Sequence, residues 1–148
     1  MTASAQEFVT PLTFQALSKH DVYTDTFDEK DAQFVSHIHL ADWTELAVIA
    51  PATANIVAKM ANGIADDFVS TALLATTAPR LIVPAMNQHM LENPATARNM
   101  EALKSYGYEI MKPDTGFLAE GYEGKGRMPE PEKIVEAAQL VVLNNAKE

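Results

Sequence analysis

Short runs of apolar residues alternate along the chain with longer segments in which apolar residues recur at helical spacing. Residues 45–50 end in such a run and stop at Pro51, and residues 81–83 form another that stops at Pro84. Runs without polar alternation indicate strands buried on both faces, as in a parallel sheet connected by helices. Residues 108–111 are a third strand of this kind. The pattern therefore predicts an α/β fold in which helices flank a parallel sheet.

Capping residues place the predicted helices. Ser4-Ala5-Gln6-Glu7 has the spacing of a capping box, so a helix is expected from there to about Leu17, with an interruption at Pro11. Asn93 and Pro94 provide an N-cap and a first helical position, and this helix is expected to end near Tyr106. The other predicted elements are helices over 54–62, 67–77 and 131–143, a helix start over 31–39, and a short strand at 22–23.

Residues 112–128 form the longest predicted loop. They contain five glycines or prolines and show no periodic pattern. A loop of this length in a compact domain usually has a function or lacks a fixed structure. We therefore expect no helix or strand in this segment.

Two buried strands end in proline, alanine and an asparagine, at Pro51 to Asn55 and at Pro84 to Asn87. Ligands of parallel α/β sheets bind beyond the carboxyl ends of the strands, where both segments are predicted to lie. Alanine permits close approach, and an asparagine amide offers a donor and an acceptor. A single segment is equally well explained as a strand-to-helix turn with a capping residue. Two segments at one edge favour a ligand site.

Composition restricts the partners. A net charge of −9 over 148 residues argues against nucleic acid and anionic membranes, although a local pocket can still bind a small anion. The sequence has no cysteine, which excludes disulfides and thiolate metal sites. No apolar run approaches the roughly 20 residues that span a bilayer, and the N-terminus does not resemble a signal peptide. We expect one cytoplasmic domain over residues 1–148, without a metal.

Several motifs resemble those of one enzyme family. PATAN at 51–55 resembles the PASANT motif, and PAMNQHM at 84–90 the PxMNxxM motif, of the homo-oligomeric flavin-containing cysteine decarboxylases, which include the phosphopantothenoylcysteine decarboxylases of the coenzyme A pathway. The resemblance covers nearly the whole chain. It implies a Rossmann-like (flavodoxin-like) three-layer sandwich. The supporting segments are residues 8–18, 37–43, 62–67 and 121–134.

The resemblance also implies a chemistry. Such enzymes bind FMN and oxidise the cysteine thiol of 4′-phosphopantothenoylcysteine. The resulting thioaldehyde accepts electrons, so that CO₂ leaves, and reduced flavin then returns electrons to give 4′-phosphopantetheine. The cofactor performs the redox steps, and the protein orients the substrate and protonates the intermediate. The family forms trimers and sometimes dodecamers with FMN between subunits, so a homo-oligomer is expected.

The resemblance assigns two catalytic residues. His37 matches the family's catalytic histidine, and imidazole can exchange protons at physiological pH. A lone histidine is also common at helix ends and in cores, and pairing with His39 as a metal site lacks further ligands. Asn87 matches the asparagine that binds the substrate carboxylate. An N-cap for a helix from Gln88 is the competing interpretation, and both can hold.

Further residues are assigned to binding by the same resemblance. Thr53 and its neighbours also suit a helix cap, and a methionine such as Met86 is also typical of a core. The predicted cofactor contacts are Thr2, Phe8, Pro51, Thr53, Ala54 and Asn55. The predicted substrate contacts are Met86, Asn87, Ala119, Gly121, Arg127 and Met128.

The sequence departs from the family in two places. Glu120 stands where the family has the cysteine that protonates the intermediate, so it is a third candidate catalytic residue, which replaces or impairs the reductive half of the reaction. A glutamate can be a general acid only if burial raises its pKa, and a glutamate in a loop is usually a solvated charge. The family also begins with a strand, a glycine- and serine-rich turn that holds the FMN phosphate, a helix and a second strand. Met1-Thr2 falls at the end of that second strand, and the first glycine is Gly63. The expectation is a sheet without those two strands.

Alternatives from other classes remain open. The enzyme could stop at an oxidised enethiol, as peptidyl-cysteine decarboxylases without this cysteine do. A non-catalytic regulatory subunit would suit a damaged site, but His37 and Asn87 argue against it. A flavin prenyltransferase shares the fold, but it lacks the PxMN motif and needs basic phosphate-binding residues.

Overall fold

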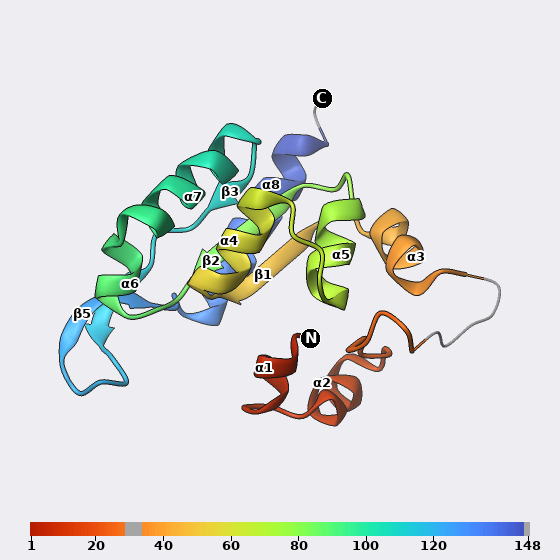
Figure 1. Ribbon diagram of the computed structural model, residues 1–148, viewed down its shortest axis with the longest axis horizontal. Coiled ribbons are helices and arrows are strands. Elements are labelled where there is room, and N and C mark those ends of the chain that lie inside the picture. Colours follow the sequence, from red (N-terminus) through yellow and green to blue (C-terminus); the bar gives the residue numbers. More distant parts are fainter. Residues whose placement is uncertain (29–33, 147–148) are drawn as a thin grey trace. The chain divides into compact units, whose positions relative to one another are not determined.

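The computed structural model describes residues 1–28 and 34–146 (Figure 1). The chain divides into two compact units, which are described separately: one comprises residues 1–43 and 64–77, and the other comprises residues 44–63 and those from Ala78 onward. One domain over residues 1–148 therefore stays a prediction.

The second unit contains the parallel sheet. Strands β1 (Ala47–Ala52), β2 (Arg80–Pro84) and β3 (Glu109–Ile110) pair in the order β1-β2-β3, all parallel. Residues 81–83 of the central strand are at most 2% exposed, as expected for a strand covered on both faces. The predicted parallel sheet is confirmed.

Helices cover both faces of this sheet. Leu81 and Val83 point to one face, where they form a core cluster with Ile134 and Val141 of α8 (Pro131–Asn145). Figure 1 shows α4 (Ala54–Asn62) in front of the strands and α8 behind them. Helix α4 packs against α7 (Pro94–Ser105), and both contribute buried residues. This arrangement is the expected flavodoxin-like, three-layer sandwich.

Local capping explains where the helices begin. Thr53 Oγ1 accepts a hydrogen bond from the Ile56 N–H at 3.4 Å, and α4 ends at Gly63, whose φ of 65° is left-handed. Asn93 Oδ1 accepts from the Ala95 N–H at 2.9 Å to cap α7. These boundaries agree with the predictions for both helices.

The predicted loop over 112–128 is wrong, because it contains a β-hairpin. Strands β4 (Asp114–Phe117) and β5 (Glu123–Arg127) pair antiparallel. Gly116, Gly124 and Gly126 occupy strand positions, so no alternation of apolar and polar side chains marks the strands.

The other unit is helical in its described residues. It contains α1 (Ala3–Gln6), α2 (Pro11–Ser18), α3 (Ser36–Trp43) and α5 (Phe68–Ala75), so the predicted interruption at Pro11 is confirmed. The strand predicted at 22–23 is wrong: the Tyr23 ring instead stacks on Phe68, with ring centroids 5.1 Å apart. The helix start predicted over 31–39 lies partly outside the described residues, and α3 begins at Ser36.

Candidate functional site

The two proline-alanine motifs lie side by side at the carboxyl edge of the sheet. Ala52 of β1 is in register with Pro84 of β2, and the Ala85 N–H donates to the Ala52 carbonyl at 3.0 Å. The shared edge predicted from the sequence is confirmed. The turns that follow Pro51 and Pro84 therefore begin next to each other.

The first motif presents a small polar turn. Thr53 caps α4, and Thr53 and Asn55 are both exposed, with Ala54 half-buried between them. Pro51 is exposed as well. The capping interpretation of Thr53 is therefore correct, and the exposed side chains leave the turn accessible to a ligand.

The second motif places the amide of Asn87. Its Oδ1 accepts from the His89 N–H at 2.8 Å and caps the short helix α6 (Gln88–Glu92). That cap turns the amide nitrogen away from the helix, toward the tip of the β4–β5 hairpin. Nδ2 donates to Glu120 Oε1 and to the Tyr122 hydroxyl, both at 2.9 Å. Both donor positions of Asn87 are therefore in use.

Glycines allow the hairpin to approach this motif closely. The Met86 N–H donates to the Gly126 carbonyl at 3.0 Å, and the Lys125 N–H donates to Gln88 Oε1 at 3.2 Å. A Cβ on Gly126 would lie 1.9 Å from the Met86 carbonyl oxygen, and the φ of Gly126 is 134°. A Cβ on Gly124 would lie 2.7 Å from Gln88 Oε1. The glycine-rich segment is therefore a packed hairpin, and its contact with the Met86 carbonyl requires glycine at position 126.

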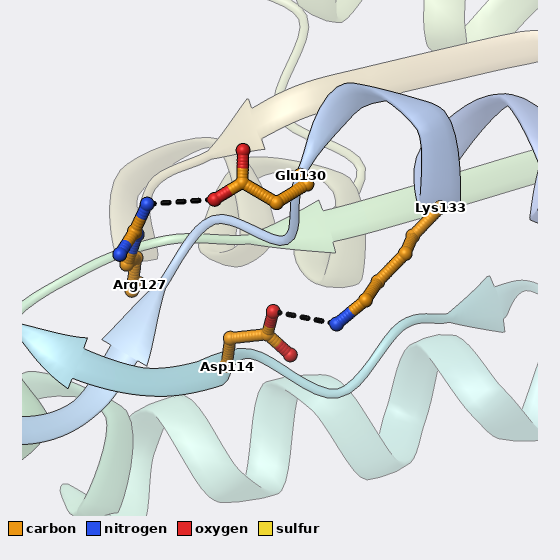
Figure 2. Close-up of polar contacts among 4 residues, drawn as sticks. All are labelled: Asp114, Arg127, Glu130 and Lys133. Atoms are coloured by element: carbon orange, nitrogen blue, oxygen red, sulfur yellow. Dashed lines mark hydrogen bonds and ion pairs between the residues drawn. The ribbon is translucent and has the colours of Figure 1, made fainter.

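Two ion pairs lie at the base of the hairpin (Figure 2). Lys133 of α8 contacts Asp114 at 3.0 Å, and Arg127 contacts Glu130 at 2.7 Å. Both pairs are largely exposed, so each contributes little stability. Arg127, a predicted substrate contact, already has an internal carboxylate partner. Met128, another predicted contact, is half-buried and packs against the core cluster.

Glu120 does not have the environment that a general acid needs. It is exposed at the hairpin tip between Ala119 and Gly121, which are exposed too. The hydrogen bond from Asn87, followed by a backbone hydrogen bond at Glu120, lowers the pKa of this carboxyl. A general acid in place of cysteine requires a raised pKa. The structure therefore argues against Glu120 as the proton donor.

His37 belongs to the other unit. It lies in α3, half-buried, and its ring meets Phe68 edge-on with centroids 6.4 Å apart. Its Nδ1 atom is buried and has no hydrogen-bond partner among the residues that the structure describes. In the same unit, Thr2 Oγ1 caps α1 through the Ala5 N–H at 3.1 Å, and Phe8 is 89% exposed. One ring nitrogen of His37 is therefore buried without a hydrogen bond from the described part of the chain.

Two residues of the site were not found from the sequence. Tyr122 shares the Asn87 amide with Glu120, and Gln88 holds the hairpin through Lys125. Gln88 lies inside the PAMNQHM motif, so that motif could have marked it as a candidate. Tyr122 is identified only by the pairing of the hairpin.

The fold and the site define a flavodoxin-like α/β protein in which two polar turns share the carboxyl edge of β1 and β2. The chain belongs to the Flavoprotein family, whose profile matches residues 1–143. It is 58% identical over 139 residues to the coenzyme A biosynthesis bifunctional protein CoaBC of Bacillus subtilis, covering 94% of this chain and 34% of that protein. The chain thus spans about a third of the length of this curated relative.

Solved structures agree with this assignment. A PPC decarboxylase mutant complexed with pantothenoylaminoethenethiol is 33% identical, with a TM-score of 0.85 over 94% of this chain and 79% of the other. The FMN-dependent cysteine decarboxylase SpaF is 34% identical, with a TM-score of 0.82 over 97% of this chain and 77% of the other. Among the described residues, no helix has the length and apolar character needed to cross a bilayer.

Proposed function

We propose that this chain carries the FMN-dependent decarboxylation of 4′-phosphopantothenoylcysteine to 4′-phosphopantetheine, in coenzyme A biosynthesis in the cytoplasm. The observation that carries the proposal is the Asn87 amide, which its helix cap aims away from the helix at the carboxyl edge of the sheet. The relatives named for coenzyme A biosynthesis and PPC decarboxylase support this substrate.

The start of α4 fits a flavin. Thr53 and Asn55 are exposed and polar, Ala54 is small, and the first amides of a helix have no intrahelical acceptor. Bound FMN would supply the oxidation of the substrate thiol and the return of electrons. Pro51, Thr53, Ala54 and Asn55 would hold it there, with Thr2 and Phe8 as further proposed contacts.

Asn87 would bind the carboxylate that leaves. A neutral amide orients a carboxylate without the stronger attraction of a salt bridge, so it opposes departure as CO₂ less than an arginine would. Met86, Ala119 and Gly121 lie on the same motif or at the hairpin tip, and Arg127 and Met128 follow in and beyond β5. These five remain proposed substrate contacts.

His37 would exchange a proton with the substrate. Its buried Nδ1 has no hydrogen-bond partner among the described residues, and a ligand that reached it would satisfy a nitrogen that is costly to leave unpaired. His37 and Asn87 belong to different units, and the proposed homo-oligomer, a trimer or dodecamer, would supply both to one site.

A specific observation supports a second candidate. The sequence has no cysteine, and the lowered pKa of Glu120 makes it a poor proton donor. Without that acid the reaction would stop after decarboxylation, at the oxidised enethiol. Replacing Glu120 by Cys tests this candidate: the fully reduced product should appear faster with E120C than with the native chain, and equal rates would reject it.

Retention of FMN tests the main proposal. The protein is incubated with FMN, desalted and examined by visible spectroscopy, beside the double variant Thr53→Val with Asn55→Leu. The native chain should keep a flavin band near one per chain, and the variant should lose most of it. A colourless native protein that also fails to release CO₂ from the substrate would overturn the proposal.

A further inference from the structure

The hairpin tip places a carboxylate of the protein on the amide proposed to bind the substrate carboxylate. Glu120 Oε1 lies 2.9 Å from Asn87 Nδ2. Since the other Nδ2 hydrogen points to the Tyr122 hydroxyl and Oδ1 caps α6, the amide has no free donor. An incoming carboxylate must displace one of these two acceptors.

Glu120 is the acceptor that is easier to displace. It is exposed at the tip of the hairpin, in the turn closed by the hydrogen bond from the Gly121 N–H to the Leu118 carbonyl at 3.0 Å. The hairpin below is held more firmly, through Met86, Gln88 and the close contacts of Gly124 and Gly126. A movement confined to residues 118–121 would free the amide without undocking the strands.

We propose that Glu120 is a specificity-determining residue that competes with the substrate carboxylate for the Asn87 amide. The inference rests on the proposed function for the identity of the substrate. Its physical basis is that one donor cannot serve two carboxylates at once, and that two carboxylates brought together repel each other. A ligand without a carboxylate need not displace Glu120, so the competition weakens the binding of the carboxylate-bearing substrate relative to that of the decarboxylated product.

The test compares two unreactive ligands on the FMN-loaded protein. One is 4′-phosphopantothenoylserine, which has the carboxylate and a hydroxyl in place of the thiol, and the other is its counterpart without the carboxylate. Calorimetry with Glu120→Ala should show about two- to fivefold tighter binding of the first, the range of an exposed ionic contact, and unchanged binding of the second. Glu123→Ala is the control: it removes an exposed charge from the same hairpin, and Glu123 is not one of the two residues that accept from the Asn87 amide.

Equal gains for both ligands would mean that the tip only obstructs access, and no gain would mean no competition; either result overturns the inference. A second probe keeps the inference testable if neither ligand binds. Acetate is titrated onto the protein while the side-chain amide resonances of Asn87 are followed by NMR. Glu120→Ala should steepen their response, whereas identical responses in the native chain and both variants would overturn the competition independently of the substrate.

Discussion

Asn87 and His37, the two proposed catalytic groups, are in opposite states. The Asn87 Nδ2 atom donates to Glu120 and Tyr122 at the hairpin tip, and its Oδ1 atom accepts from the His89 N–H. Both donor positions of the amide are therefore occupied by the protein. The buried Nδ1 of His37 has no partner in the described part of the chain. The difference indicates that a ligand at Asn87 must replace hydrogen bonds within the protein, whereas a ligand that reached the buried Nδ1 of His37 would add a hydrogen bond.

The largest expected effect concerns His37. Replacing it by Gln keeps a polar side chain but removes proton exchange, so turnover should fall by about a hundred- to ten-thousand-fold. His39→Gln is the matched control, because His39 is exposed on the same helix and its ring lies against Phe34. Steady-state decarboxylation rates measure both. Equal losses in the two variants would remove the catalytic role of His37.

The next effect concerns Asn87. Asn87→Ala should lower kcat/KM by about ten- to a hundredfold, the range for a lost hydrogen bond to a charged group. Asn93→Ala is its control, since Asn93 caps α7 through the same kind of Oδ1 contact, at 2.9 Å. Both variants lose a helix cap, which costs about 1 kcal/mol of stability. Similar kinetics in both would show that Asn87 matters only as a cap.

The docking of the hairpin is tested at Gly126. Gly126→Ala should lower the free energy of unfolding because its Cβ would meet the Met86 carbonyl. The loss should exceed the cost of an unfavourable positive φ alone, which is about 1–3 kcal/mol. Gly107→Ala shares a positive φ, 84°, but its Cβ would meet nothing within 4 Å. Denaturant unfolding gives the stability, and hydrogen exchange at the Met86 N–H reports docking. Unchanged protection of that amide in Gly126→Ala would contradict the packed hairpin.

The smallest effect is the titration of Glu120. Its pKa is lowered by the Asn87 hydrogen bond, so the contact is fully present above the unfolded-state pKa and is lost as the pH falls through the folded-state value. The carboxyl ¹³C shift of Glu120 should therefore titrate with a midpoint below that of an unperturbed glutamate. In Asn87→Ala the midpoint should rise, and a midpoint that does not move would mean that the contact is absent in solution.

Local chemistry explains which parts of the fold could be predicted. The predicted bounds of helix α4 match the observed ones because its two ends are set by the residues directly beside them, Thr53 at the start and Gly63 at the end. The hairpin was missed because its glycines erase the alternation that marks a strand. Tyr23 was assigned to a strand because its long-range partner, Phe68, is not visible in the local pattern.

In the site, too, local features could be predicted from the sequence and long-range contacts could not. The positions of the two motifs follow from the order of strands and turns, and the capping role of Asn87 follows from its neighbours. Its contact with Glu120 joins residues 33 positions apart. No local rule reveals such a contact, so the partner of the amide and the lowered pKa of Glu120 emerged only from the folded chain.

The most direct test of the account is a single-turnover reaction of the FMN-loaded protein with 4′-phosphopantothenoylcysteine, analysed by mass spectrometry. The account predicts a product that has lost CO₂, as the reduced thiol or, for the second candidate, as the enethiol with two fewer hydrogens. Substrate recovered unchanged from a protein that has retained its flavin would contradict it.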